Sequence, residues 1–283
     1  MELTDKKLHE AARSIREWVV RSLASAGSGH LGGSLGLADV FTYLYFKELK
    51  HKPLDPGWHD RDILILSIGH VAPVLYATLA HAGYFPKEEL MTLRKLGSRL
   101  QGHPGRDHGL PGVELSAGSL GQGVGVAVGI ALARQMDQHP GRVFCVAGDG
   151  ELQEGSVWEA AMAAAHYQLH NLVVIVDRNG VQIDGNTETV MQLEPLAAKW
   201  ESFGWAVIEC DGHNFGSLRK AFEATRISQN KPKVIIAKTT MGKGVQEIEG
   251  DFRWHGKAPD ATQAQRFLKQ IAEYYESLEK QRQ

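Results

Sequence analysis

Two strongly apolar runs end in polar residues, and this pairing constrains the fold more than any other feature of the chain. Residues 143–147 (VFCVA) lead into a Gly-Asp-Gly turn centred on Asp149, and residues 172–177 (LVVIVD) are soon followed by Asn179. Apolar runs of this length are typical of strands in a parallel sheet that is covered on both faces. Residues 154–169 between them have helical spacing and can form the crossover. We therefore expect Asp149 and Asn179 to meet at the carboxyl ends of adjacent parallel strands, where open α/β sheets bind ligands.

The Gly-Asp-Gly turn fits a divalent cation held against a diphosphate. Mg²⁺ takes oxygen ligands in an octahedron, commonly from one or two protein side chains together with substrate phosphates. The flanking Gly148 and Gly150 carry no Cβ, which lets the backbone come close to phosphate groups. The turn by itself also fits a connection without a ligand, so these residues alone leave both interpretations open.

Bulk composition excludes several classes of partner. The 283 residues carry a formal net charge of −2 and the sequence pI is about 6.7, so no global field attracts nucleic acid or an anionic membrane. Cys145 and Cys210 both lie in apolar runs, which favours buried thiols in a reducing compartment over disulfides. The sequence has no apolar segment of signal-peptide or membrane-spanning length. We expect a soluble, cytoplasmic protein.

Strand-like and helical segments alternate along the chain, which predicts right-handed crossovers and a parallel sheet. The predicted fold class is α/β, a mostly parallel sheet with helices on both faces, in a single domain over residues 1–283. An amphipathic helix over residues 8–23 opens the chain and stops at Gly27. One further helix is predicted after Gly69-His70, and the others span residues 121–138, 154–169, 196–203, 215–228 and 261–278. The predicted strands span residues 62–67, 143–147, 172–177, 205–210 and 233–239.

Four of the thirteen histidines stand beside glycine in predicted loops. They are His30, His70, His103 and His255, in the strings GSGHLGGS, SIGHVAP, QGHPG and RWHGKAP. Glycine next to a loop histidine permits close approach of a ligand, and imidazole can exchange hydrogen bonds with sugar hydroxyls near neutral pH. Each of the four, taken singly, also fits an ordinary core or surface histidine. The histidines that we expect to be ordinary surface residues include His51, His59, His81, His108 and His139.

The string GDGELQEGSVWEAAMAAAHYQLHNLVVIVDRNGVQIDG is similar to the thiamine diphosphate motif, and its wording resembles that of transketolases. The turn SAGSLGQG and the stretch MGKG followed by WHG also match that family. The resemblance runs from about residue 5 to about residue 260 and corresponds to the diphosphate-binding domain of transketolase. It implies the thiamine diphosphate-binding fold, with thiamine diphosphate and Mg²⁺ as cofactors and Ca²⁺ or Mn²⁺ able to substitute for the metal.

The resemblance assigns roles to individual residues. It implies that Mg²⁺ is held by the side chains of Asp149 and Asn179 and by the main-chain carbonyl of Val181. The catalytic residues that it implies, which move protons and hold sugar hydroxyls, are His30, His70, His103 and His255. The cofactor contacts that it implies come from His70, Gly118, Leu120, Asp149, Gly150, Glu154, Asn179, Ile183, Lys243 and His255. For Lys243, a plain surface lysine is the alternative interpretation.

The implied reaction transfers a two-carbon ketol unit from a ketose phosphate to an aldose phosphate. A full-length transketolase continues with a pyrimidine-binding domain and a C-terminal domain, which supply the glutamate that activates the aminopyrimidine and most of the groups that grip the sugar phosphate. We predict that these domains are on a separately encoded C-terminal subunit, with two of each chain in the assembly. The resemblance places Glu154 at the interface with that subunit.

Two alternatives are open at this point. A 1-deoxyxylulose-5-phosphate synthase shares the early histidine and GDG signatures, although its members are single long chains and the SAGSLGQG and WHG strings favour transketolase. The other alternative is a non-catalytic subunit retained as a binding or scaffold protein, against which the full sets of predicted metal ligands and loop histidines argue. The sequence does not determine the donor and acceptor sugars, and both the pentose phosphate route and a specialised sugar route fit.

Overall fold

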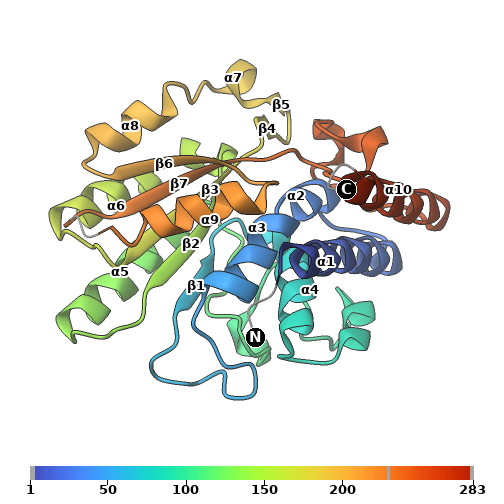
Figure 1. The fold of residues 1–283 in the computed structure, drawn as a ribbon, viewed down its shortest axis with the longest axis horizontal. Helices are drawn as coiled ribbons and strands as arrows, with labels where there is room; N and C mark the ends of the chain where they lie inside the picture. The colour runs from blue at the N-terminus through green and yellow to red at the C-terminus, as the bar shows by residue number, and fades with distance from the viewer. Residues whose placement is uncertain (1–3, 228–229, 281–283) are drawn as a thin grey trace.

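A five-stranded parallel sheet forms the centre of the computed structural model, which describes residues 4–227 and 230–280 (Figure 1). The strands lie in the order β1-β2-β3-β7-β6, and every neighbouring pair is parallel. Their bounds are β1 (Ile63–Leu66), β2 (Val143–Gly148), β3 (Leu172–Arg178), β6 (Ala206–Asp211) and β7 (Lys233–Lys238). The predicted fold class and the five predicted strands are thus confirmed.

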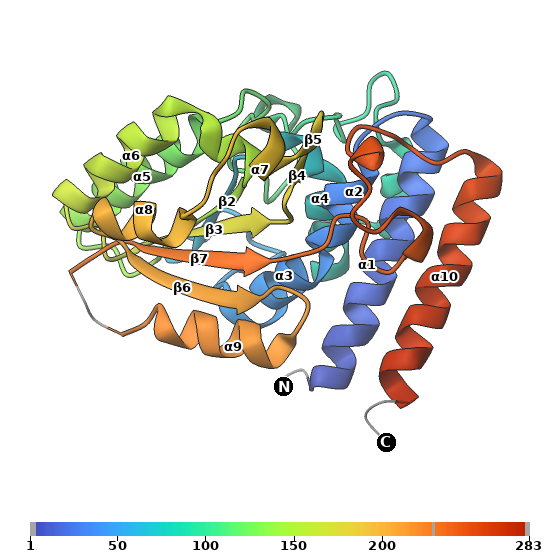
Figure 2. The same cartoon turned by 90° about the horizontal axis from the view of Figure 1, so that it is seen from above.

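Alternate residues of each strand enter two separate hydrophobic cores. In β2, Phe144 and Val146 pack into one core, whereas Cys145 and Ala147 pack into the other. This alternation is what a sheet covered on both faces requires. One face carries α5 (Gln122–Met136), α6 (Gly155–His166) and α8 (Leu196–Ser202). The other face carries α1 (Asp5–Ala26), α3 (Ala38–Tyr43), α4 (Ala72–Ala82) and α9 (Phe215–Ala224) (Figure 2).

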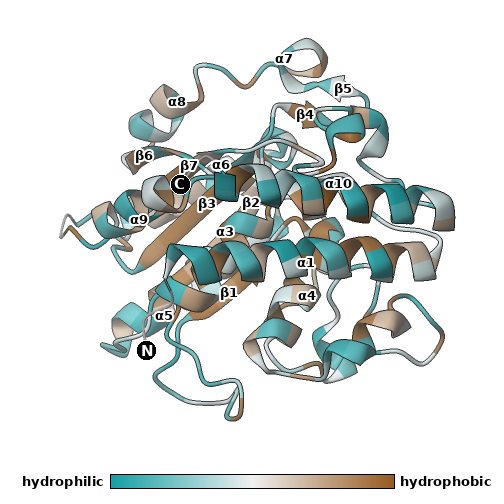
Figure 3. Ribbon diagram, turned by 45° about the vertical axis from the view of Figure 1, so that its right-hand side comes forward, coloured by the Kyte–Doolittle hydropathy of each residue, from teal (hydrophilic) through white to brown (hydrophobic). Residues whose placement is uncertain are grey.

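The first and last helices pack side by side outside the second core. Leu8, Ile15 and Val19 of α1 are buried, as three- and four-residue spacing predicts. The helix ends at Gly27, whose left-handed φ of +66° lets its N–H donate to Leu23 O at 3.0 Å. Helix α10 (Ala261–Lys280) lies against α1, and both helices present hydrophilic stripes outward (Figure 3).

Residues 31–48 form helices that the sequence analysis did not predict. They comprise α2 (Leu31–Gly36), α3 and a short π-helical turn over Leu44–Glu48. Almost all of these side chains are buried, so the segment has no polar face and therefore no amphipathic period to detect. The other predicted helices are confirmed within a few residues at their ends, and the predicted end of the α9 segment at Ser228 lies outside the described residues.

A short segment crosses the carboxyl edge of the sheet between β3 and α8. It contains the antiparallel pair β4 (Val181–Gln182) and β5 (Gly185–Asn186), followed by α7 (Thr187–Val190). Asn186 caps α7 through a hydrogen bond from Glu188 N to its Oδ1 at 2.9 Å. Across residues 4–227 and 230–280, every helix is too short or too polar to cross a membrane.

Candidate active site

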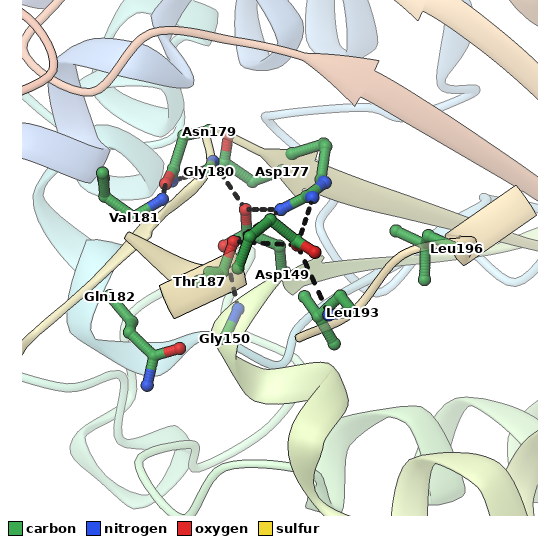
Figure 4. A network of polar contacts seen from close by, with 12 residues as sticks. Asp149, Gly150, Asp177, Asn179, Gly180, Val181, Gln182, Thr187, Leu193 and Leu196 are labelled. Atoms are coloured by element: carbon green, nitrogen blue, oxygen red, sulfur yellow. Dashed lines mark hydrogen bonds and ion pairs between the residues drawn. The ribbon is translucent and has the colours of Figure 1, made fainter. Parts of the chain in front are cut away.

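Asp149 and Asn179 lie close together at the carboxyl edge of the sheet, as the strand pattern predicts. Asp149 N donates to Asp177 O at 3.2 Å, across the ends of β2 and β3. The Asp149 carboxylate is buried; its Oδ1 accepts from Gly150 N at 2.8 Å and its Oδ2 from Gly180 N at 2.7 Å (Figure 4). Burial raises the pKa of this carboxyl, and the hydrogen bonds oppose that shift only in part. The acid is therefore held in one orientation with spare acceptor capacity on its oxygens.

The turn after β3 brings Asn179 and Val181 to the same cavity as Asp149. Gly180 has a φ of +77°, which glycine adopts without strain. The Asn179 amide is fixed at both ends, since its Nδ2 donates to Asp177 Oδ2 at 2.8 Å and its Oδ1 accepts from Val181 N at 3.0 Å. Carboxylate, amide and carbonyl oxygens are the ligands that hard divalent cations prefer. The three predicted metal ligands thus converge on one place.

The cavity has a volume of about 430 Å³ and opens at the carboxyl ends of β1, β2 and β3. This size is within the usual range for sites that bind small molecules. Of the predicted site residues, those that line it are His30, His70, His103, Gly118, Leu120, Asp149, Gly150, Glu154, Asn179, Val181, Ile183 and His255.

The four loop histidines form one cluster in this cavity. The ring centroid of His30 lies 5.0 Å from that of His70, 6.0 Å from that of His103 and 5.7 Å from that of His255. His70 and His255 are 4.8 Å apart. Burial, helped by the neighbouring rings, lowers the pKa of His70 to about 3 and that of His30 to about 4. Burial also lowers the pKa of His103 and His255.

Neutral imidazoles can both donate and accept hydrogen bonds, so this cluster can bind hydroxyl groups in either sense at neutral pH. His30 has unused capacity. Its Nδ1 is buried, and within the described part of the chain it has no hydrogen-bond partner. A buried nitrogen of this kind is costly unless a ligand or water meets it. Its position at the centre of the cluster makes it a contact point for a bound molecule.

Close backbone packing places His70 beside the turn that contains Gly118 and Leu120. A Cβ on Gly69 would lie 2.8 Å from the backbone of Ala117 and Gly118, a distance that real side chains do not adopt. Glycine at position 69 is therefore required for β1 to end against this turn. Both Gly118 and Leu120 line the cavity, and the Leu120 side chain is still 36% exposed.

Glu151 was not predicted, yet it ties together three loops of the site. Its buried Oε1 accepts from Ser67 Oγ at 2.5 Å and from Gly121 N at 2.8 Å, and its Oε2 accepts from Gly148 N at 3.1 Å. Burial raises the pKa of this carboxyl despite these bonds. A second acidic residue directly after the Gly-Asp-Gly turn was the available signal, but its partners are brought to it only by the folded chain.

Lys243 does not line the cavity, so the structure contradicts its predicted cofactor contact. Gly242 and Gly244 both have left-handed backbone conformations, and the loop directs the ammonium away from the histidine cluster. The Lys243 Nζ lies 3.5 Å from a Glu249 carboxylate oxygen and 5.2 Å from the centroid of the Tyr274 ring. Lys243 thus belongs to the contact between this loop and α10.

The structure also corrects two of the histidines that were expected on the surface. His81 is half-buried, and its two ring nitrogens lie 2.9 Å from Ala77 O and 2.8 Å from Ser14 Oγ. His51 is likewise half-buried, with its Nε2 2.7 Å from Tyr45 O. Both histidines pack within the helical layer, away from the cavity.

Comparison with known proteins decides the family. The sequence model described as "Transketolase, thiamine diphosphate binding domain" matches residues 7–275. This chain belongs to the transketolase family. The prediction made from the GDG and histidine strings is therefore confirmed, and with it the thiamine diphosphate-binding domain.

Relatives of similar length are transketolase subunits. A 6-deoxy-6-sulfo-D-fructose transketolase subunit from Clostridium sp. (strain MSTE9) is 44% identical over 88% of this chain and 90% of its own length. One of the two subunits of an apulose-4-phosphate transketolase, from Phocaeicola vulgatus, is 40% identical over 94% of both chains. The predicted enzyme class, the N-terminal subunit of a split transketolase, agrees with these relatives.

Solved transketolase structures share the fold but are much longer. The transketolase from Campylobacter jejuni superposes with a TM-score of 0.89 at 35% identity, covering 95% of this chain and 43% of that chain. The present chain therefore spans less than half the length of the solved transketolases that it matches, although it spans nearly all of the subunit relatives.

The donor groups of the cavity fit a metal-bound diphosphate cofactor. Asp149, Asn179 and Val181 offer three oxygen ligands of the kind that Mg²⁺ takes, and the glycine at position 150 leaves room for phosphate oxygens beside them. The unpaired Nδ1 of His30 provides a polar contact at the histidine cluster. These observations indicate a cavity with one end suited to a cation and the other suited to hydroxyl groups.

Proposed function

We propose that this chain is the N-terminal subunit of a transketolase that depends on thiamine diphosphate and Mg²⁺, with Ca²⁺ or Mn²⁺ able to substitute. The observation that carries the proposal is the convergence of three oxygen ligands and four neutral histidines on one cavity. The reaction transfers a two-carbon ketol unit from a ketose phosphate to an aldose phosphate. When bound, the cofactor supplies the nucleophilic carbon and the electron sink for breaking the bond.

The residues of the chain divide the work. Asp149, Asn179 and the Val181 carbonyl hold the cation, which in turn holds the diphosphate. The rings of the other three histidines lie 5.0, 6.0 and 5.7 Å from that of His30, so the four can hold substrate hydroxyls and accept or return a proton. Because burial keeps their pKa values low, each is neutral and can act as a base at pH 7.

A partner is proposed because the cavity is bordered by exposed apolar side chains. Ile183 is 63% exposed, and Leu120 lies half-exposed on the same rim with Glu154 beside them. The neighbouring α5–α6 face adds the exposed side chains Val126 and Met162. Apolar groups of this kind are typical of protein interfaces. We propose that a separately encoded subunit with the pyrimidine-binding and C-terminal domains covers them, giving two of each chain, and that residues 1–283 form the diphosphate-binding domain alone.

The names of the relatives favour this function over the alternatives. Those named above are transketolases or their subunits, which favours a transketolase over a 1-deoxyxylulose-5-phosphate synthase. The complete set of converging ligands disfavours a non-catalytic scaffold. The substrates of those relatives differ, so both the pentose phosphate route and a specialised sugar route fit.

Cytoplasmic location is proposed from the cysteines. Cys145 and Cys210 are both buried free thiols. Burial raises the pKa of Cys210 to about 12 and that of Cys145 well above its usual value. Such thiols are unreactive hydrophobic side chains, and they are compatible with a reducing compartment.

Mixing experiments test the proposed function. The chain and a candidate partner encoded beside it are purified, and light scattering and a coupled ketol-transfer assay are run on each alone and on the mixture. We expect activity and a four-chain mass only in the mixture with thiamine diphosphate and Mg²⁺. Full ketol transfer by this chain alone would overturn the split-enzyme proposal.

A further inference from the structure

Arg178 connects the cation end of the cavity to the segment that crosses the sheet edge. It is the last residue of β3 and immediately precedes Asn179. Its guanidinium Nη1 lies 3.1 Å from Asp149 Oδ2 and donates to Thr187 Oγ1 at 2.8 Å. Its Nη2 donates to Glu188 Oε1 at 2.7 Å and to Glu194 Oε1 at 2.9 Å. The side chain is only 12% exposed, so these contacts are partly shielded from water.

The two glutamates carry the backbone of the segment with them. Glu188 accepts from Leu193 N at 3.3 Å and from Glu194 N at 3.2 Å. Glu194 accepts from Leu196 N through its other oxygen at 2.8 Å. The guanidinium therefore holds residues 187–194 as a unit, and buried Thr187 adds a hydrogen bond from its N to Gly180 O at 3.0 Å.

The same guanidinium sets the orientation of Asp149. Arg178 and Gly180 N both donate to Oδ2, whereas Oδ1 receives Gly150 N alone (Figure 4). Oδ1 is thereby the oxygen with the greater free capacity. A carboxylate fixed by a partner outside the ligand shell is a common way to tune a metal site. Arg178 thus determines which oxygen is available to a cation.

Charge also links the two regions. One guanidinium serves the three carboxylates of Asp149, Glu188 and Glu194, which leaves the group negative overall. A divalent cation at Asp149 relieves this excess, and the interaction is strong because the pair is largely buried.

We propose that Arg178 is a positioning residue that couples cation binding at Asp149 to the closed conformation of residues 187–194. In this account the cation and the closed segment stabilise one another, because both use the same guanidinium-bound carboxylate. The proposal rests on the proposed metal role of Asp149, and the experiment below separates the failure of one from the failure of the other.

The test compares Arg178→Lys, Arg178→Met and Glu194→Gln in the full chain at saturating thiamine diphosphate. Mg²⁺ is titrated by calorimetry, and amide hydrogen exchange of residues 187–194 is followed with and without Mg²⁺. We expect Mg²⁺ affinity about tenfold weaker in both arginine variants and a loss of the Mg²⁺-induced protection of the segment. Glu194→Gln leaves Asp149 untouched, and we expect it to raise exchange in the segment and weaken Mg²⁺ by a smaller factor. Arg219→Met, which removes an exposed pair with Asp5 on a distant helix, is the matched control.

Each outcome has a definite meaning. If Asp149→Asn binds Mg²⁺ as tightly as the wild type, the proposed metal site itself is wrong. If Asp149→Asn loses Mg²⁺ but Arg178→Lys keeps wild-type affinity and wild-type protection, only the positioning role is overturned, since a retained charge would then suffice. Arg178→Lys is the decisive variant because it keeps the charge but loses the fork that bridges the acidic groups.

Discussion

Two groups of buried carboxylates in this protein have opposite electrostatic settings. In the helical layer, Asp39 of α3 receives Arg16 Nη1 at 2.9 Å and Arg16 Nη2 at 2.6 Å, and it also lies 2.8 Å from His213 Nδ1. Burial by itself would raise the pKa of Asp39, but the guanidinium and the histidine hydrogen bond overcome that effect and hold it well below its usual range. Arg16 itself is fully buried against the Tyr275 hydroxyl of α10. This acid is fully compensated.

The carboxylates at the sheet edge are not compensated to the same degree. Burial raises the pKa of Asp149 and Glu151, and it raises that of Asp177 to about 7. Their hydrogen-bond donors are largely backbone N–H groups and hydroxyls, and the guanidinium beside Asp149 is shared with two glutamates. The comparison teaches that the fold uses a matched ion pair where it needs stability and leaves negative charge unmatched where a cation is to bind.

The largest expected effect concerns turnover. His103→Ala and His255→Ala should each lower the turnover of the assembled enzyme about 10²–10⁴-fold, the usual size of acid–base assistance. Cofactor affinity should change far less, because both rings lie at the hydroxyl-binding end of the cavity. The control is His108→Ala, an exposed histidine of the same loop region. Parallel losses of cofactor affinity and turnover in either variant would show a structural role instead.

The compensated pair gives the largest expected effect on stability. Arg16→Met should lower the free energy of unfolding by about 3–5 kcal/mol, because Asp39 is then buried without its partner. Arg13→Met on the same helix removes only an exposed pair with Glu17 and should change stability by less than about 0.5 kcal/mol. Urea unfolding measures both. Equal effects of the two substitutions would contradict the assigned difference between matched buried and exposed pairs.

The smallest expected effect is a pH dependence of stability from His81. Burial lowers the pKa of this ring to about 4, so the unfolded chain binds the proton first as pH falls through about 6.5. The ring therefore stabilises the fold above that pH relative to lower pH, and about 1 kcal/mol should be lost by pH 5 after allowing for its partial exposure. His81→Gln should have a flatter profile between pH 7 and pH 5 in urea titrations. An unchanged slope would remove His81 as its source.

The sheet and the cation end of the cavity were predictable because their signals are local. Apolar runs that end in Asp149 and Asn179 report both the strands and the edge where they meet. The four loop histidines were predictable from their glycine neighbours and the family resemblance. Their clustering around His30 confirms that they share one cavity.

The remaining features depend on tertiary contacts that no local pattern reports. Arg178 became part of the site only because residues 187–194 fold back over the strand end. Glu151 acquired its role from loops that are distant in sequence. Lys243 was predicted wrongly because the two left-handed glycines beside it reverse the chain. Residues 31–48 were missed because burial on all sides removes the period that identifies a helix.

The most direct test of the central claim is the stability of Asp149→Asn with and without cofactor. Unmatched charge at the sheet edge is taken to serve cation and diphosphate binding, not folding. Without ligand, the variant should unfold within about 1 kcal/mol of the wild type, since it removes a carboxylate whose burial is itself costly. With thiamine diphosphate and Mg²⁺ at about 100 times the wild-type Kd, the wild type should gain about 2.7 kcal/mol and the variant less than half of that. Equal gains in the two proteins would contradict the account.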